Sequence, residues 1–457
     1  MSLKIYDTAR REKVAFEPID ANDVRLYVCG PTVYDYIHIG NARPLVVFDV
    51  LYRLLKASYP SVKYVRNITD VDDKINARAR ENGESIRDLT ERTNDQFQSD
   101  AKAIGCLEPD VQPRATEHIQ EMQDIIARLI ARGHAYAAEG HVLFDTKSWD
   151  DYGKFANKDL EELEAGARVE VAPYKKNAAD FVLWKPSDDD TPGWDSPWGR
   201  GRPGWHIECS AMSAKHLGES FDIHGGGLDL IFPHHQNEVA QSCCGNEADR
   251  GFAKYWMHNG YLMSEGEKMS KSLGNFYTVH ELLEDFPGEA LRLVILQTHY
   301  RQPLDFSKDK LREAKAMLDR MYGALREVAD VEAVITDSDP VLDALTDDVN
   351  TAKAMAALHE AVGDLNKAAT DADKAAAKGR VELAGRLLGI LQQDPEAWFK
   401  GDAGDDDAGE IEALIQKRAD AKAAKDFATA DAVRDELTAR GIVLEDKPGG
   451  KTEWRRS

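Results

Sequence analysis

A strand, turn, helix and strand pattern near the N-terminus constrains the fold of this chain most strongly. Residues 24–30 (VRLYVCG) are apolar and rich in strand-forming types, and the GPT that follows interrupts the run. Apolar residues at helical spacing then run from near His38 to Leu55, and a second apolar run follows at 62–69 (VKYVRNIT). The pattern predicts a parallel βαβ unit, whose ligand would bind beyond the first strand, where Cys29 and His38 lie.

The remaining pattern predicts several further segments, because 457 residues are too many for one core. A helical stretch, a hairpin-like stretch and irregular sequence rich in Trp, Pro, Gly and Asp separate two α/β stretches. We therefore predict an α/β fold with a split Rossmann-type nucleotide-binding domain, an insertion, a helical bundle and a small C-terminal α/β domain. The predicted division is 1–115 (first half), 116–200 (insertion), 201–250 (second half), 251–306 (lysine-containing loop), 307–395 (bundle), 396–409 (linker) and 410–457 (small domain).

Composition narrows the function classes. No apolar run approaches the roughly 18 residues of a membrane span, and the N-terminus lacks the apolar centre of a signal peptide, so we expect a cytoplasmic protein without membrane contact. Five cysteines at irregular spacing argue against a disulfide framework and leave metal binding or catalysis. A net charge of −23 is unfavourable for a nucleic-acid partner unless the chain carries a local basic face. We predict such a face at Arg292, Arg301, Lys308, Lys310 and Arg312.

Two short sequences carry the chemistry of phosphate handling. In His38-Ile39-Gly40-Asn41, a helix N-terminus supplies oriented N–H groups, Gly40 allows close approach, and His38 can donate a hydrogen bond to a phosphate. In the sequence KMSKS at 268–272, Lys268 and Lys271 place two cations in a glycine-flanked segment, which suits a departing pyrophosphate.

The two sequences together, in this order, resemble the two signatures of the class I aminoacyl-tRNA synthetases. A set of Cys29, Cys209, His234 and Glu238 between them resembles the cysteinyl branch of that family, and the resemblance covers nearly the whole chain. The fourth position of the first signature is often histidine in the family, whereas Asn41 here is similar to the cysteinyl branch.

The resemblance implies a role for each matching residue. It implies catalytic roles for His38, Asn41, Lys268 and Lys271, and a substrate pocket that includes Thr69, Trp205 and His224. It also implies ATP binding by Gly40, Lys271 and the glycine-rich turn after SFDIH, where Gly226 and Gly227 allow close approach and Asp229 could accept from ribose hydroxyls. Core packing remains an alternative for Thr69 and Trp205.

The four-residue set predicts one bound zinc ion. His234 and Glu238 are four residues apart and share a helix face, and two thiolates, an imidazole and a carboxylate suit zinc. His235 competes with His234 because it lies three residues from Glu238, and His224 is an alternative candidate for a supporting position beside the metal. Cys106, Cys243 and Cys244 are interpreted as packing residues.

The implied activity is ATP-dependent ligation of L-cysteine to tRNA(Cys), with ATP bound as its Mg²⁺ complex. Cysteine would first form cysteinyl adenylate and then pass to the 3′ end of the tRNA, while zinc selects the substrate thiol over serine. We expect a monomer. The tail would read the anticodon, and Trp454, Arg455 and Arg456 offer an aromatic platform with adjacent cations. In an alternative interpretation, Trp454 packs on Ile442 and Leu444.

Three other functions remain as alternatives. A cysteine ligase that acts on an amino sugar, as in mycothiol synthesis, would share the catalytic half, but it would lack the tail at 410–457. A zinc hydrolase would leave both signatures unexplained, and a nucleic-acid-binding module without catalysis would explain only the tail. Pyrophosphate release with ATP and cysteine separates the two adenylate-forming functions from the other two.

Overall fold

The computed structural model describes residues 3–158, 172–246, 251–267, 269, 275–336, 339–400, 405–446 and 452–456. The chain forms two compact units. The first unit comprises Met1–Ala314, Asp337–His359 and Arg386–Ile390. The second comprises Lys315–Thr336, Glu360–Gly385 and Leu391–Ser457.

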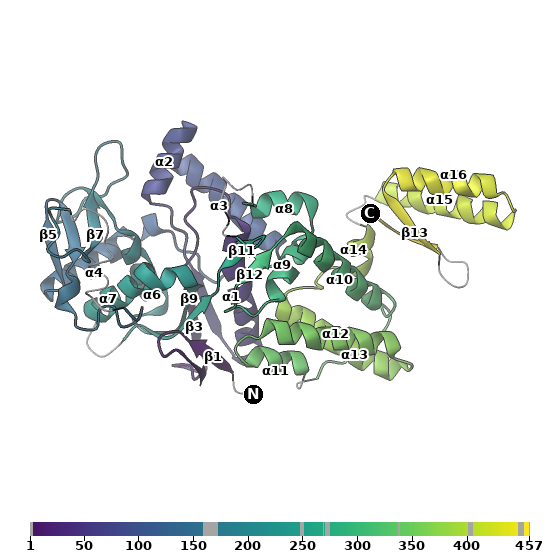
Figure 1. Cartoon of the computed structure of the whole chain (residues 1–457), viewed down its shortest axis with the longest axis horizontal. Helices are drawn as coiled ribbons and strands as arrows, with labels where there is room; N and C mark the ends of the chain where they lie inside the picture. Colours follow the sequence, from purple (N-terminus) through teal and green to yellow (C-terminus); the bar gives the residue numbers. More distant parts are fainter. Residues whose placement is uncertain are drawn as a thin grey trace. The chain divides into compact units, whose positions relative to one another are not determined.

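A parallel four-stranded sheet forms the centre of the first unit, in the order β10-β9-β3-β4. Figure 1 labels its two inner strands, β9 and β3. Strand β3 (Val24–Val28) pairs with β4 (Val62–Arg66) on one side and with β9 (Phe221–Gly227) on the other, and β10 (Ala253–Asn259) pairs with β9. Helix α1 (Ile39–Ser58) connects β3 to β4. The predicted βαβ unit and the split α/β domain are confirmed, because strands from both sides of the insertion share one sheet.

The insertion contains its own antiparallel sheet, in the order β5-β6-β7-β8, together with α4 (Ile119–Ala131). These strands are Ala135–Ala138, His141–Phe144, Phe181–Pro186 and Gly201–Pro203. The stretch that we interpreted as irregular therefore supplies β7. Leu183 and Trp184 are consecutive residues of β7, and both are buried. The strand therefore lacks the alternation of apolar and polar residues that identifies a half-exposed strand.

Two predicted boundaries differ from the structure. The antiparallel sheet continues to Pro203 rather than ending at residue 200, and the parallel sheet includes β10, which lies beyond the predicted end at residue 250. Strand β10 is an edge strand of the sheet and still has five consecutive buried residues, so its sequence does not show which domain it joins.

Helices and short strands surround these two sheets in the first unit. The helices are α2 (Asp73–Asn82), α3 (Ile86–Ala103), α6 (Trp205–Leu217), α7 (Gln236–Gly245), α8 (Val279–Asp285) and α9 (Gly288–Leu296). Short helical turns lie at Ala115–Glu117, Thr146–Ser148, Leu228–Leu230 and Ile231–His235. The strands β1 (Lys4–Asp7) and β2 (Glu12–Ala15) form a hairpin, and β11 (Leu262–Ser264) pairs with β12 (Leu304–Phe306).

The described residues between Lys308 and Lys400 contain helices and no strand, as the apolar spacing predicts. They form α10 (Lys308–Arg326), α11 (Pro340–Thr346), α12 (Thr351–Lys367), α13 (Asp371–Leu388) and α14 (Pro395–Lys400). No helix of the described residues is long and apolar enough to cross a membrane.

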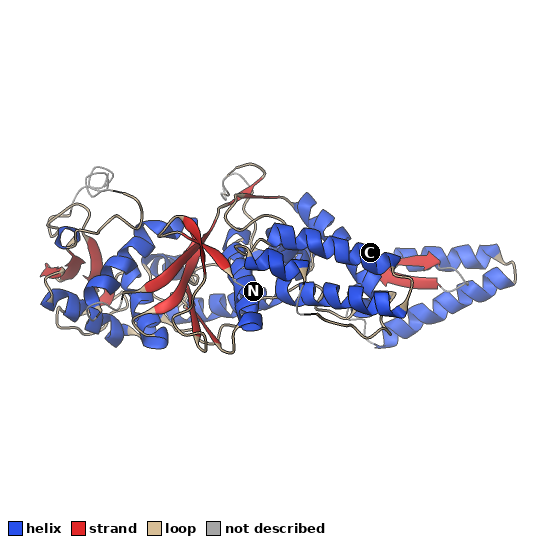
Figure 2. Ribbon diagram, turned by 90° about the horizontal axis from the view of Figure 1, so that it is seen from below, coloured by secondary structure: helices blue, strands red, loops and turns tan. Residues whose placement is uncertain are grey.

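The tail consists of two helices and a hairpin, which Figure 2 shows in blue and red. Helices α15 (Asp405–Ala423) and α16 (Phe427–Ala439) pack on each other, and β13 (Ile442–Asp446) pairs with β14 (Thr452–Arg456). The prediction of a linker at 396–409 is wrong at both of its ends, because α14 extends to Lys400 and α15 begins at Asp405. Acidic sequence is favoured near a helix N-terminus by the helix dipole, so an acidic run does not identify a linker.

The tail has a small core that includes Trp454. The indole is only 3% exposed and packs with Ile411, Val433, Leu437 and Ile442. The prediction that Trp454 is a platform for bases is therefore wrong, and the alternative of packing across the hairpin holds, since Trp454 is the cross-strand partner of Leu444.

The predicted basic face is also wrong. Arg292 is fully buried and pairs with Asp49, and Arg301 pairs with Asp348. The three remaining cations pair with carboxylates close by: Lys308 with Asp285, Lys310 with Asp305, and Arg312 with Asp309. The sequence lists the cations but not the acidic partners that neutralise them.

Candidate functional site

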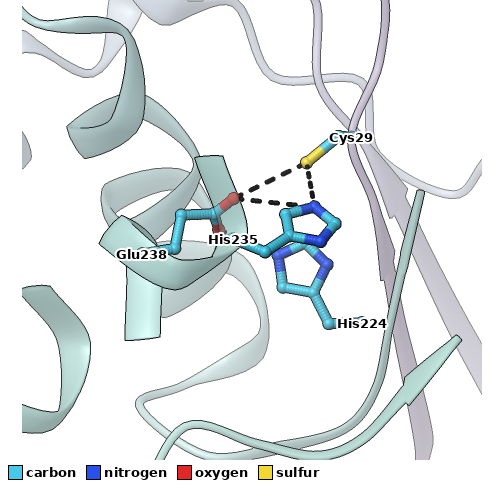
Figure 3. A group of neighbouring side chains, drawn as sticks. All are labelled: Cys29, His224, His235 and Glu238. Carbon is cyan, nitrogen blue, oxygen red and sulfur yellow. Dashed lines mark hydrogen bonds and ion pairs between the residues drawn. The ribbon is translucent and has the colours of Figure 1, made fainter. Parts of the chain in front are cut away.

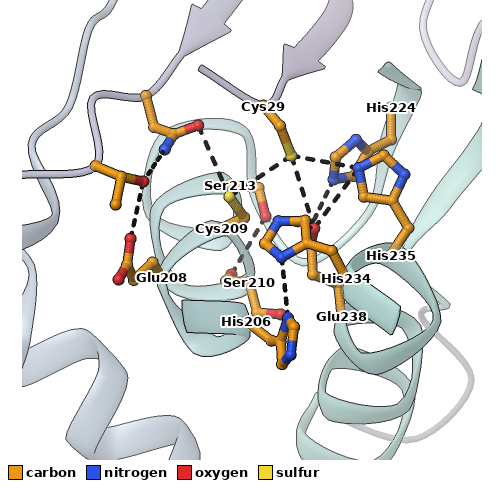
Figure 4. Close-up of polar contacts among 12 residues, drawn as sticks. Cys29, His206, Glu208, Cys209, Ser210, Ser213, His224, His234, His235 and Glu238 are labelled. Atoms are coloured by element: carbon orange, nitrogen blue, oxygen red, sulfur yellow. Dashed lines mark hydrogen bonds and ion pairs between the residues drawn. The ribbon is translucent and has the colours of Figure 1, made fainter. Parts of the chain in front are cut away.

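The four predicted metal ligands meet at the carboxyl edge of the parallel sheet (Figure 4). Cys29 directly follows β3, Cys209 lies on α6, and His234 and Glu238 lie one turn apart where a short helical turn continues into α7. Their candidate ligand atoms all lie within 4.8 Å of one another. Cys209, His234 and Glu238 are buried, whereas Cys29 is partly exposed.

The spacing of the donor atoms fits a tetrahedral zinc ion. The two Sγ atoms are 3.7 Å apart, and two sulfurs at the usual zinc–sulfur distance would be about 3.8 Å apart in a tetrahedral site. Cys29 Sγ lies 3.7 Å from Glu238 Oε1, and His234 Nε2 lies 2.9 Å from the same oxygen. These donors are close enough to share one ion without a change in the backbone.

A second group overlaps the first and consists of Cys29, His224, His235 and Glu238 (Figure 3). His235 Nε2 lies 3.3 Å from Cys29 Sγ, and His224 Nε2 lies 2.8 Å from Glu238 Oε2. Both His234 and His235 are therefore placed where they could bind a metal ion together with Cys29 and Glu238. The set with Cys209 contains two thiols, and zinc prefers thiolates, so this set is the better zinc site.

The electrostatics of the group favour charged donors. Burial acts to raise the pKa of Glu238, but His224 and His234 outweigh it and lower that pKa to about 2. Burial acts to lower the pKa of His234, but Glu238 and Cys209 raise it to about 10. A hydrogen bond from Cys29 lowers the pKa of Cys209 to about 6. The proton on His234 thus balances the Cys209 thiolate and the Glu238 carboxylate, while burial raises the pKa of the Cys29 thiol. A bound cation would replace these protons, because a metal ligand must be a thiolate, a neutral imidazole or a carboxylate.

A hydrogen-bonded chain fixes the cysteine ligands. Asn67 Oδ1 accepts from the Gly30 N–H at 2.9 Å and lies 3.7 Å from Cys209 Sγ. The Asn67 amide donates to Thr69 Oγ1, and the Thr69 hydroxyl donates to Glu208 at 3.0 Å. The sequence pointed to Thr69 but missed Asn67 and Glu208. Asn67 offered one signal, because it is a polar residue at the end of β4, beside the expected ligand site.

Trp205 and His224, the other two predicted pocket residues, differ in their exposure to solvent. Trp205 is 40% exposed and stacks on the His234 ring with centroids 4.3 Å apart, so it can cover a ligand at the metal site. His224 is fully buried behind Glu238, and its prediction as a substrate-contacting residue is wrong. His224 orients the carboxylate instead, which matches the alternative of a supporting position.

The first signature forms the N-terminus of α1. His38 is the N-cap residue, and its Nδ1 accepts from the Gly40 N–H at 3.1 Å, so Nε2 carries the proton of the neutral ring. Burial lowers the pKa of His38, while the charge of Asp229 acts to raise it. Asn41 Oδ1 accepts from the His38 N–H at 3.2 Å, which completes the cap. His38 is therefore a fixed neutral donor.

The second signature lies next to the first. Lys268 and Lys271 are outside the described residues, but Met269 and the chain from Asn275 are described. A Cβ on Gly40 would lie 3.0 Å from Met269 Cε and 2.8 Å from the His38 ring. The Ile39 N–H donates to the Tyr277 carbonyl, so Met269 of the second signature and the chain shortly after the signature lie against the start of α1.

The glycine-rich turn lies after β9. A Cβ on Gly226 would lie 2.9 Å from the His235 ring, and one on Gly227 would lie 2.4 Å from Asp229 Oδ1. Asp229 is exposed, so its carboxylate is accessible to a ligand. The protein's own side chains therefore leave no room for a Cβ at either glycine, and the approach of a nucleoside to this turn stays a prediction.

Arg43 on α1 connects the two signatures and was missed. Its guanidinium is fully buried and donates to the carbonyls of Gly260 (2.8 Å), Tyr261 (2.5 Å), His299 (3.3 Å) and Gln302. The first two carbonyls directly precede β11 and the other two precede its partner β12, and the second signature follows β11 in the chain. An arginine inside an apolar helix was the only sequence signal.

The comparisons with known proteins agree with this geometry. Residues 15–316 match the family model for the tRNA synthetases class I (C) catalytic domain, residues 340–392 match the DALR domain, and residues 405–455 match the Cysteinyl-tRNA ligase anticodon binding domain. The chain is 62% identical to a cysteine–tRNA ligase of Paramagnetospirillum magneticum and 59% identical to one of Rhodospirillum rubrum, each over 100% of both chains.

Solved structures support the fold. A methionyl-tRNA synthetase of Mycobacterium tuberculosis in complex with methionyl-adenylate superposes with a TM-score of 0.59 at 15% identity, covering 85% of this chain and 96% of that one. An Agrobacterium radiobacter LeuRS in a ternary complex with tRNA and LeuAMS gives 0.60 at 12% identity, covering 84% and 85%.

Proposed function

The chain belongs to the cysteine–tRNA ligases, a family with a class I tRNA synthetase catalytic domain, and from this premise we propose how its site performs the reaction. L-cysteine and ATP form cysteinyl adenylate and pyrophosphate, and the cysteinyl group then passes to the 3′ end of tRNA(Cys) with release of AMP. The observation that carries the proposal is the meeting of the two-thiol group with the first signature at one sheet edge.

Adenylate formation needs positive charge and hydrogen-bond donors at the α-phosphate. The N-terminus of α1 presents N–H groups there, and the Nε2–H of His38 donates to a phosphate oxygen as the cysteine carboxylate attacks. The Asn41 side-chain oxygen keeps the cap closed, and Gly40 leaves room for the nucleotide. Lys268 and Lys271 neutralise the leaving pyrophosphate.

The nucleoside lies along the glycine-rich turn after β9. Gly226 and Gly227 allow its approach, and the Asp229 carboxylate accepts from the ribose hydroxyls.

Cys29, Cys209, His234 and Glu238 would hold one zinc ion. When bound, the ion would supply a soft Lewis acid for the substrate thiolate. Serine has no equivalent anionic ligand at neutral pH, because its alcohol resists deprotonation. The partly exposed side of Cys29 leaves the approach open, and Trp205 covers the His234 side. Thr69 lines the same region and is held by Glu208.

The tail at 405–455 reads the anticodon of tRNA(Cys), by similarity to the family model that it matches. Arg455 and Arg456 remain the candidate contacts on β14. The matched tail also disfavours the amino-sugar ligase, because that alternative would lack it.

Two assays of the purified chain test this function. We expect pyrophosphate exchange with ATP to depend on cysteine, and serine to support it at least 10²-fold less well at equal concentration, which exceeds the discrimination that shape alone provides. We also expect cysteine attachment to tRNA(Cys). Exchange without attachment would favour the amino-sugar ligase, and the absence of exchange would contradict both ligase functions.

A further inference from the structure

We propose that the buried hydroxyl of Tyr27 donates a hydrogen bond to the Cys209 thiolate and thereby prepares the proposed zinc site for the substrate thiolate. The inference rests on the proposed function, because it assigns a positioning residue to the same site. Tyr27 lies in β3, two residues before Cys29, and its side chain is fully buried.

The backbone places the Tyr27 side chain on the face of the sheet that carries the metal group. Cys29 continues the pairing of β3, since its N–H donates to the Gly225 carbonyl at 3.2 Å. Residues two apart along a strand point to the same face, so Tyr27 and Cys29 lie on one side of the sheet. Tyr27 is also the cross-strand partner of His224, with ring centroids 5.2 Å apart, and His224 bonds to Glu238. Tyr27 therefore has a metal ligand next to it along its strand and a ligand-holding histidine next to it across the sheet.

Helix α6, which carries Cys209, contacts β3. Tyr27 and Cys209 belong to one core of buried side chains, and Cys29 packs against that core. Burial raises the pKa of the Tyr27 hydroxyl well above its ordinary value of 10, and the charges of Cys209 and Cys29 add to the effect. The hydroxyl therefore keeps its proton at neutral pH and is available as a donor.

The Tyr27 hydroxyl has no hydrogen-bond partner among the described residues, although it is buried. Buried polar groups in folded proteins are nearly always paired, and an unpaired one is destabilising. Cys209 is an acceptor next to it. The Cys209 sulfur already receives hydrogen bonds from Cys29 and from His234. Tyr27 is therefore a donor whose acceptor is occupied by other groups.

Metal binding would free Cys209 for this donor. A bound cation replaces the protons of Cys29 and His234, because a metal ligand must be a thiolate or a neutral imidazole. The Cys209 sulfur then loses the hydrogen bonds that it receives from these two residues. Another neighbour, Asn67 Oδ1 at 3.7 Å, can only accept. A metal-bound thiolate at Cys209 therefore needs a new donor, and the Tyr27 hydroxyl supplies it.

The charge of the site explains why the thiolates need donors. Two thiolates and one carboxylate exceed the charge of a zinc ion by one, and a substrate thiolate would add a second excess negative charge to a buried group. A hydrogen bond to a thiolate withdraws charge from the sulfur, so a bound ion keeps more Lewis acidity for a further ligand. Cys29 has such a donor in His235, whose Nε2 lies 3.3 Å from its sulfur. Tyr27 is the corresponding donor for Cys209.

The test compares Tyr27→Phe with Tyr64→Phe in the full-length chain. Each substitution removes one buried phenol oxygen and keeps the ring. The hydroxyl of Tyr64, in the adjacent strand β4, also lacks a hydrogen-bond partner within the described part of the chain. Its charged neighbours are Arg66, Cys106 and Asp49 rather than the metal group. Tyr64 therefore matches Tyr27 in burial and chemistry but not in position.

We expect Tyr27→Phe to weaken zinc binding about tenfold or more, measured by competition with a chelator, and Tyr64→Phe to leave it within about twofold. In the chelated protein neither substitution should lower the melting temperature, because neither hydroxyl is bonded there. With zinc added, Tyr27→Phe alone should lose part of the stabilisation that the ion provides. An equal fall of the melting temperature with and without zinc would mean that the hydroxyl has a merely structural role, and would overturn the inference.

The zinc-loaded variant also measures the effect on the substrate. At saturating zinc, Tyr27→Phe should raise the KM for cysteine in pyrophosphate exchange about tenfold or more, while the KM for ATP stays within about twofold. With cobalt in place of zinc, the sulfur-to-metal charge-transfer band should move to lower energy in Tyr27→Phe, because the sulfur then donates more charge to the metal.

Equal zinc affinity, KM for cysteine and charge-transfer energy in Tyr27→Phe and wild type would show that the hydroxyl does not bond to the thiolate, and would overturn the inference. A loss of ATP affinity that matches the loss for cysteine would also overturn it. Failure of the proposed function would look different, because the wild type itself would then hold no zinc or show no cysteine-dependent exchange.

Discussion

Cys209 is the fully buried thiol ligand of the proposed zinc site. It is buried between Cys29 and Asn67, and its pKa of about 6 keeps it largely a thiolate at neutral pH. We expect Cys209→Ser to lose most of the zinc, because an alcohol is a poor zinc ligand. Metal analysis checks this result, with Cys244→Ser as a buried control outside the group. Retention of one zinc per chain in single variants at all four ligands would contradict the assignment.

Two histidines outside the metal group should make the stability of the folded chain depend on pH. His118 Nε2 and His216 Nε2 are 2.9 Å apart, so one ring must donate and the other accept. Burial lowers the pKa of His216 below its ordinary 6.5, and His118 adds to the effect. A lowered histidine pKa in the folded state means that the unfolded state binds more protons on acidification, so stability falls as the pH drops through 6.5.

The measurement is the midpoint of thermal unfolding from about pH 7.5 to about pH 5.5. His216→Gln should reduce the fall of the midpoint across this range. His141→Gln is the control, because that ring stacks on Tyr174 and bonds only locally. If His216→Gln and wild type lose the same stability on acidification, the pair does not set this dependence.

At the residue scale, local spacing predicted some contacts and could not predict others. His234 and Glu238 were predictable neighbours because a helix places residues four apart on one face. The bond from Thr69 to Glu208 joins residues 139 positions apart, and no local pattern encodes it. A tryptophan such as Trp454 can belong to a core or can stack on a base, so its residue type does not separate the two roles. The packing of α15 and α16 against the hairpin is what buries it. Cys243 was interpreted as a packing residue but is exposed, whereas Cys106 and Cys244 are buried.

Among the elements of the fold, Arg43 holds α1 to the segments that precede the paired strands β11 and β12, and the second signature follows β11. Lysine in its place has one ammonium group and cannot reach carbonyls on two segments at once. We expect Arg43→Lys to lower the pyrophosphate exchange rate about tenfold or more at saturating cysteine, because the two signatures lose their common support. Steady-state exchange measures this, with the melting temperature recorded in parallel.

Arg292→Lys is the matched control for Arg43→Lys. Arg292 is equally buried and also donates to carbonyls, but its partners are Asp49, Gly105 and Leu388, away from the second signature. The lysine should lower the melting temperature without a comparable loss of exchange, because one ammonium group cannot keep the bonds to Asp49, Gly105 and Leu388 together, while Arg53 still pairs with Asp49. Equal loss of exchange in both variants would show that Arg43 acts only through stability.

The elements themselves were predictable where their periodicity is complete. The β3, α1 and β4 unit has a strand pattern, a breaker and a long amphipathic helix, all of which are local signals. Strands β7 and β10 were missed or misplaced because a buried strand lacks alternation and its membership depends on distant partners. The linker prediction failed for a different reason, since acidic sequence suits both a linker and a helix start.

At the scale of the whole molecule, the tail should be separable from adenylation. The predicted end of the bundle at residue 395 would place the cut there, but the structure places it later. Trp398 of α14 stacks on Tyr322 at 4.5 Å and bonds to Asp319, so a cut before α14 would remove a packed side chain from α10. A chain that ends at Lys400 keeps these contacts.

We expect the chain that ends at Lys400 to keep cysteine-dependent pyrophosphate exchange within about twofold and to charge tRNA(Cys) at least about tenfold more slowly. The full chain should charge tRNAs with altered anticodons more slowly than tRNA(Cys), and the shortened chain should charge both at similar rates. Equal anticodon discrimination by the full and shortened chains would show that the tail is not the reader.

We propose that Cys29, Cys209, His234 and Glu238 hold a zinc ion that binds the substrate thiolate. X-ray absorption at the zinc edge, recorded on the purified protein with and without L-cysteine, measures the ligands of this ion. We expect two sulfur ligands at about 2.3 Å in the free protein and a third when cysteine is added, with no change when serine is added. A sulfur count that stays the same with cysteine would contradict it.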